Sequence, residues 1–179
     1  IPSGSLTLGE LDIGHGLGGN TESTAIGKNA LDASLSGSIR NTAVGQDALG
    51  ALNHADADYN VAVGSYAGDA ITQGERNTAV GDHALSATAT ADNNTAVGQS
   101  ALGSGVCASN NTAVGKHALT NCASDYNVAV GSNSGDAITT GVRNTAVGHN
   151  SLGATDDGHD NTAVGNSALA ANCGDNNVA

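Results

Sequence analysis

Few residues of this sequence could do chemistry, and the three cysteines come first among them. Cys107 lies four residues before Asn111, and Cys122 lies five residues before Asn127. These asparagines begin neighbouring repeats, so the two thiols should lie at nearly the same corner of adjacent coils. Stacked strands are about 4.8 Å apart, which is within the Cα separation that a disulfide accepts. The sequence therefore predicts a Cys107–Cys122 disulfide. Cys173 could pair with a further coil, pair with another chain or stay a free buried thiol.

Aspartates in the loops are the only candidates for a metal site. The densest cluster is Asp156, Asp157 and Asp160, next to Asn161. Calcium needs six to eight oxygen ligands, and the nonapeptide motif of calcium-binding rolls is absent from the sequence. These three aspartates are therefore weak calcium candidates, and the sequence predicts no other metal site.

Nothing in the sequence has the pattern of a catalytic centre. The six histidines are scattered over different positions of the repeat and show no metal-ligand spacing. No Ser–His–Asp set, P-loop, dinucleotide motif or pair of catalytic carboxylates stands out. The sequence predicts no enzyme activity and no cofactor.

Long side chains recur at one place, directly before the asparagine of the repeat. Arg40, Arg76 and Arg143 lie there, and Tyr59 and Tyr126 take the same place in two other repeats. We expect these side chains to pair with aspartates or to stack in a neighbouring coil or chain, in preference to binding a ligand.

The elements that must position these residues follow from one pentapeptide, Asn41 to Gly45, which returns along the chain with little change. The glycines of successive copies fall at 27, 45, 64, 81, 98, 115, 131, 148 and 165, so the spacing is 16–19 residues. A short motif at so steady a spacing is the signature of a repeat architecture. We predict an all-β fold, a β-solenoid of about nine coils over residues 20–179. Residues 1–19 form an irregular lead-in or cap, with short strands at 6–8 and 11–13.

Stacking the coils turns each position of the repeat into a column. Side chains alternate along a strand, so Thr42 and Val44 should face one side and Ala43 the other. The column that holds Val44 and Val97 admits only Val and Ile, and we predict that it forms the core. The column that holds Leu49 and Leu102 should also be buried and should begin a second short strand.

Two coils replace the leucine with Gly68 or Gly135. Ile71 and Ile138 follow three residues later in these coils. We expect the two coils to turn differently so that they deliver the same apolar group to the core.

The asparagine column should be structural, because asparagine tolerates left-handed corners and stacked amides bond one another along a ladder. Its members are Asn41, Asn60, Asn77, Asn94, Asn111, Asn127, Asn144, Asn161 and Asn177. The threonine column leaves two interpretations open. It could pack inward or at an interface, or it could form an exposed ladder as on ice-binding solenoids.

Charge and composition exclude several classes of partner. The formal net charge is −12, which argues against binding to nucleic acid or to an anionic membrane surface. No apolar run is long enough to span a membrane. Three or four large apolar groups in a coil barely offset the entropy of ordering its residues, so we expect copies of the chain to associate.

The motif Asn-Thr-Ala-Val-Gly-x-x-Ala-Leu, as in residues 94–102, resembles the head repeats of trimeric autotransporter adhesins and the repeats of phage tail fibres. The resemblance covers about residues 20–179. It implies a left-handed β-roll, three chains side by side and a stiff extracellular rod or head. The chain departs from the adhesin pattern in its longer coils and in its two Gly-Asp-Ala-Ile coils.

Two functions follow as expectations. The first is a structural extracellular segment of a fibre or adhesin, whose partners are further copies in a homotrimer or a head-to-tail fibre. The second is a module that binds host-surface glycan or protein weakly many times over, gaining by avidity.

Overall fold

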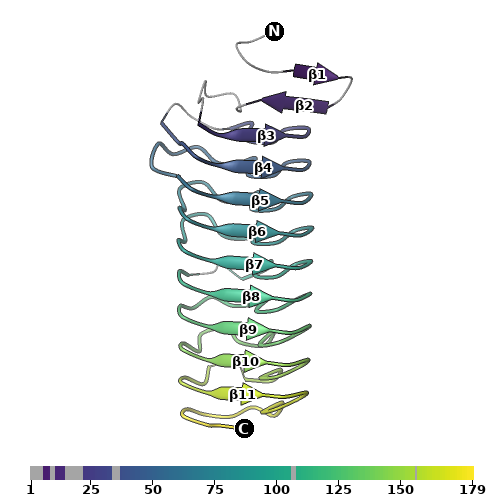
Figure 1. The fold of residues 1–179 in the computed structure, drawn as a ribbon. Helices are drawn as coiled ribbons and strands as arrows, with labels where there is room; N and C mark the ends of the chain where they lie inside the picture. The colour runs from purple at the N-terminus through teal and green to yellow at the C-terminus, as the bar shows by residue number, and fades with distance from the viewer. Residues whose placement is uncertain (1–5, 9–10, 15–21, 34–36, 106–107, 156) are drawn as a thin grey trace.

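A computed structural model describes residues 6–8, 11–14, 22–33, 37–105, 108–155 and 157–179. The described chain is all β, and it runs as a single column of coils from the N-terminal end at the top of Figure 1 to the C-terminal end at the bottom. Nine parallel strands stack in about eight turns, so the predicted β-solenoid is confirmed.

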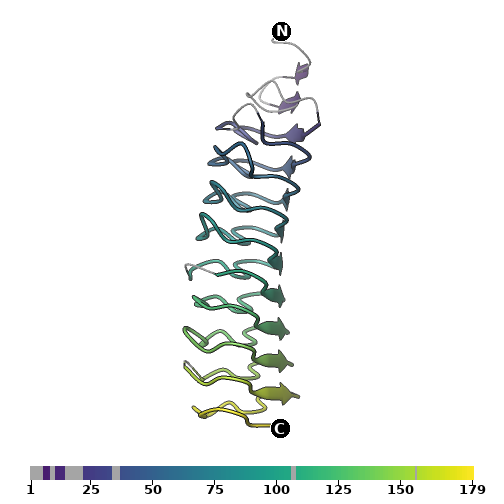
Figure 2. The same cartoon turned by 90° about the vertical axis from the view of Figure 1, so that its left-hand side faces the viewer.

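Each coil contributes one strand of three residues. These strands are β3 (Thr24–Ile26), β4 (Thr42–Val44), β5 (Val61–Val63), β6 (Thr78–Val80), β7 (Thr95–Val97), β8 (Thr112–Val114), β9 (Val128–Val130), β10 (Thr145–Val147) and β11 (Thr162–Val164). Pairing is in register throughout, as in Thr95 with Thr112, Ala96 with Ala113 and Val97 with Val114. Figure 2 shows the strands aligned along one side of the column, with the loops on the other.

The N-terminal end differs from the rest of the column. Strands β1 (Leu6–Leu8) and β2 (Leu11–Gly14) form an antiparallel pair, and β2 also runs antiparallel to β3. The short strands expected at 6–8 and 11–13 are therefore present. This hairpin occupies the upper edge of β3, which would otherwise expose unpaired backbone groups.

The core consists of alanine from the strand wall and leucine or isoleucine from the opposite wall. Ala43, Ala96, Leu49 and Leu102 are fully buried. The two walls meet closely: a Cβ built on Gly135, on the leucine wall, would lie 3.7 Å from the Cβ of Ala129 on the strand wall. So thin a core suits the composition of the chain, which has no Phe, Trp or Met.

The valine column is not in the core, and this prediction was wrong. Val44 and Val97 are only half-buried and face outward, while Val63 and Val130 are each 39% exposed. A three-residue strand directs two side chains to one face and one to the other. The space between the walls accommodates only the small middle residue, so alanine points inward and both threonine and valine point outward.

The second strand predicted at the leucine is also absent from the described coils, because the chain turns there. Asp47, Leu49 and Tyr59 have φ values of 54°, 49° and 59°, and the same three positions are left-handed in other coils. A left-handed leucine cannot continue a strand, but it aims its side chain at the core. Ordinary residues adopt this conformation at a cost of about 1–2 kcal/mol each. The hydrogen bonds between coils must offset that cost.

The Gly-Asp-Ala-Ile coils deliver an apolar group by another route, as expected. Gly68 keeps the left-handed corner at φ 60°, and Ile71 is fully buried. A Cβ built on Gly68 would lie 3.1 Å from Ile71 Cδ1 and 3.0 Å from Leu49 Cδ2. The isoleucine therefore fills the space that a leucine at position 68 would occupy.

Candidate functional site

The asparagine column is buried and joins each coil to the next. Asn111 shows the pattern: its Oδ1 accepts the backbone N–H of Asn127 at 2.8 Å, and its Nδ2 donates to the carbonyl of Ser124 at 2.8 Å. Asn127 repeats both bonds, accepting from Asn144 at 2.9 Å and donating to Gly141 at 2.8 Å. One amide supplies an acceptor and a donor, which a carboxylate or an apolar side chain cannot do. The column is thus a structural ladder.

Six further asparagines of the ladder are buried, although the Nδ2 groups of Asn94 and Asn161 have no hydrogen-bond partner among the described residues. Asn41, Asn60, Asn77, Asn94, Asn144 and Asn161 are each at most 1% exposed. The acceptor bond recurs between successive members at 2.8–3.0 Å.

The outward side chains of the strands form a second feature, called here the Thr/Val face. It has two columns, the first and third residues of strands β3–β11. The first column is Thr24, Thr42, Val61, Thr78, Thr95, Thr112, Val128, Thr145 and Thr162. The third-residue column is Ile26, Val44, Val63, Val80, Val97, Val114, Val130, Val147 and Val164. Neither column contains a charged or aromatic residue.

This face gathers most of the exposed large apolar side chains of the described chain. Val61, Val63, Val128, Val130 and Val164 belong to it. Val178 extends the first column through a parallel bridge with Thr162. The other two, Tyr59 and Tyr126, lie in the corner just before a strand. A continuous uncharged surface, with a valine column beside a column rich in threonine, can mark an interaction site.

The corner column before the asparagines carries the ion pairs and stacking that the sequence predicts. Tyr59 lies between two guanidinium groups, with Arg40 Cζ 5.3 Å and Arg76 Cζ 5.7 Å from its ring centroid. Arg40 Nε also pairs with Glu22 Oε2 at 2.9 Å. Cation–π contacts on an exposed surface stabilise by about 0.5–1 kcal/mol, so this column supports the stack of coils.

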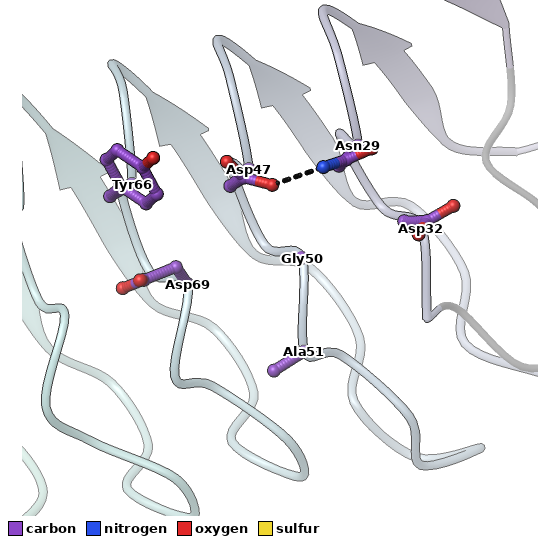
Figure 3. Close-up of a pocket in the computed structure, with 7 residues that line it drawn as sticks. All are labelled: Asn29, Asp32, Asp47, Gly50, Ala51, Tyr66 and Asp69. Atoms are coloured by element: carbon purple, nitrogen blue, oxygen red, sulfur yellow. Dashed lines mark hydrogen bonds between the residues drawn. The ribbon is translucent and has the colours of Figure 1, made fainter.

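A shallow depression of about 290 Å³ lies over the first three coils (Figure 3). Its lining includes Asp32, Asp47 and Asp69 beside Asn29 and Tyr66. Asn29 Nδ2 donates to Asp47 Oδ1 at 2.7 Å, and this hydrogen bond holds the pKa of Asp47 below its usual value. Burial raises the pKa of Asp69, whose Oδ1 is buried without a hydrogen-bond partner.

One residue of this depression recurs elsewhere in the column. Asp136 occupies the place of Asp69 in the second Gly-Asp-Ala-Ile coil, and burial raises the pKa of Asp136 as well. The raised pKa therefore belongs to this type of coil, wherever it occurs in the column.

No protein-family model, curated protein or solved structure matches the chain.

The calcium candidates do not form a site in the described part of the chain. Asp156 lies outside the described residues. Asp160 is held by Arg143, whose Nε and Nη2 donate to its two carboxylate oxygens at 2.6 and 2.8 Å. That guanidinium lowers the pKa of Asp160 and places a positive charge where calcium would bind. No group of three potential metal ligands is found among the described residues, and none of the described segments is a helix that could cross a bilayer.

The predicted disulfide stays untested, because Cys107 lies outside the described residues. Cys122 is fully buried, and its Sγ donates to the carbonyl of Ser124 at 3.3 Å. Gly105 stacks directly on Cys122, since a Cβ built on this glycine would lie 2.0 Å from the Cys122 carbonyl oxygen. Cys173, half-buried with a free thiol, lies 3.1 Å from Thr155 Oγ1.

Sequence reasoning left an exposed threonine ladder open but missed the outward valine column of the Thr/Val face, although the sequence contains a signal for it. The middle residue of every strand from β3 to β11 is alanine, a stricter choice than the Val or Ile of the third position. The strictest column indicates where space is tightest, and here that is the interior.

Proposed function

We propose that the chain is a structural segment of an extracellular fibre or adhesin head, and that it acts without catalysis. The observation that carries this proposal is the unbroken column of coils, joined by an in-register sheet and a buried asparagine ladder. Nine strands give eight steps of about 4.8 Å, or about 38 Å of stiff column. A repeat built in this way spans distance and presents what is attached to it.

The proposal includes association with further copies of the chain. The antiparallel hairpin at the N-terminal end does not repeat the outline of a parallel coil. This favours copies side by side, as in a homotrimer, over copies stacked head to tail. The net charge of −12 keeps such assemblies apart from one another in solution.

Immunogold labelling tests the location, with an antibody raised against the chain and applied to the cells or virions that carry it. Label on external fibres supports the proposal, and label confined to the interior contradicts it. Sedimentation of the purified chain tests the assembly: a mass of three chains is expected, and a monomer at all concentrations contradicts the trimer. Binding of the isolated chain to a glycan array would instead favour the multivalent binding function.

A further inference from the structure

We propose that the Thr/Val face binds the surface of ice. This function goes beyond the structural role proposed above and does not depend on it. It rests on the periodicity of the face, on hydroxyl groups that do not bond to other described residues, and on the absence of charge.

The face is a two-dimensional lattice of side chains. Neighbouring strands are about 4.8 Å apart, and the first and third residues of one strand are about 6.6 Å apart. The register is kept without a slip from β3 to β11, so both spacings repeat over the whole length of the sheet. The oxygen atoms of an ice surface also repeat in two dimensions with spacings of this size. Few other partners offer a matching lattice over such a length.

The hydroxyl groups of the face favour a partner that consists of ordered water. Seven of the nine residues in the first column are threonine, and none of these hydroxyls hydrogen-bonds to another described residue of the chain. A dry interface with a second copy would bury these hydroxyls unpaired, at about 1–3 kcal/mol each. Ordered water can pair with every hydroxyl while the adjacent methyl groups of threonine and valine pack against the lattice.

The charge distribution favours an uncharged partner. The chain has a net charge of −12, yet both columns of the face are free of charged residues. A charged polymer would find no counter-charge there. A flat carbohydrate surface commonly packs on aromatic rings, and the two columns contain none. A neutral lattice that donates and accepts hydrogen bonds is complementary to this face.

Ice partitioning tests the proposal. Ice is grown slowly from a dilute solution of the chain, and the protein captured in the ice is compared with that left in the liquid. Thermal hysteresis of a single ice crystal is the second measurement. We expect capture and hysteresis for the natural chain, and loss of both for Thr95→Tyr/Thr112→Tyr, whose rings would stand out from the centre of the face.

The matched control is Thr90→Tyr, because Thr90 is exposed in a return loop away from the strands. It should retain both properties. Val97→Lys provides a second disruptive variant if the tyrosine pair does not fold, with folding judged by circular dichroism and urea unfolding.

Three results would overturn the proposal. The natural chain could remain in the liquid without hysteresis. The face variants could bind ice as well as Thr90→Tyr does. The chain could also form an oligomer that Thr95→Tyr/Thr112→Tyr dissociates, without any binding to ice, in which case a second copy occupies the face. None of these results bears on whether antibody labels an external fibre.

Discussion

At the scale of single residues, the asparagine ladder does most to specify the stack. Each amide from Asn41 to Asn161 accepts the backbone N–H of the next asparagine, and all of these except Asn94 and Asn161 also donate to a carbonyl of the next coil. Both groups belong to the approach to the next coil, as Ser124 and Asn127 do for Asn111. The asparagine side chain of each coil therefore holds the corner of the following coil in place.

Asn111→Ala should lower the free energy of unfolding by about 1–3 kcal/mol, because it leaves the buried N–H of Asn127 unpaired and removes one of the two hydrogen bonds to the Ser124 carbonyl. Urea unfolding followed by circular dichroism measures the change. Asn53→Ala is the control, since Asn53 is exposed, and it should stay within about 0.5 kcal/mol of the natural chain. Equal effects of the two substitutions would show that the ladder does not contribute to stability.

The coils and the asparagine ladder could be predicted from the sequence, but the direction of the strand side chains could not. The period of the glycines gives the coils, and the uniform asparagine column gives the ladder. The direction of the strand side chains could not be obtained from alternation, because alternation says that Val44 and Ala43 point apart but not which one points inward. That choice depends on the distance to the opposite wall. The distance follows from left-handed leucines such as Leu49, which periodicity does not reveal.

At the scale of the strand, substitution of the inward alanine should destabilise the chain more than substitution of the outward valine. Ala96→Leu should destabilise the chain by about 1–3 kcal/mol, because it overpacks a site that is fully buried. Val97→Thr should stay within about 0.5 kcal/mol, since the new hydroxyl faces water. Urea unfolding of both variants tests the orientation of the strand. The reverse order, with Val97→Thr the more damaging, would place valine inside after all.

The Gly-Asp-Ala-Ile coils carry a pH dependence of their own. Burial raises the pKa of Asp69 and Asp136 above the 3.8 that is usual for an aspartate, so the folded chain binds more protons than the unfolded chain between the two pKa values. Stability from these groups should therefore increase as the pH falls from neutral toward about 4. Asp47 and Asp160 have lowered pKa values, and they act in the opposite direction only below 3.8.

Asp69→Asn/Asp136→Asn should raise the melting temperature at pH 7 and flatten its rise as the pH falls from 7 toward 4. Thermal unfolding at several pH values, compared with the natural chain, measures both effects. Asp56→Asn is a suitable control, because Asp56 is exposed in a loop. A double variant that melts lower at pH 7 would mean that the two carboxylates stabilise the fold as anions.

At the scale of the whole molecule, the column behaves as a one-dimensional array. Every strand from β3 to β10 contacts the strand before and the strand after it, and the contacts between coils are alike along the sheet. Stability in such an array is close to a sum over coils and their neighbouring contacts. The same regularity keeps the Thr/Val face continuous, because each added coil extends both of its columns by one residue.

Deletion of one whole coil should therefore leave a folded chain. Removing residues 77–93 brings Asn94 directly after Arg76, so the asparagine ladder, the alanine wall and the Thr/Val face all remain in register. Removing residues 77–85 instead places Ser86 after Arg76 and leaves residues 86–93 as eight extra residues in the coil that begins at Asn60. We expect the longer deletion to keep the circular dichroism spectrum of the natural chain and a cooperative urea transition, with stability lower by the contribution of one coil. The shorter deletion should be less stable than the longer one, because its loop must also accommodate the eight extra residues. If the longer deletion unfolded the chain, stability would depend on the chain as a single unit, and the additive array of coils would be refuted.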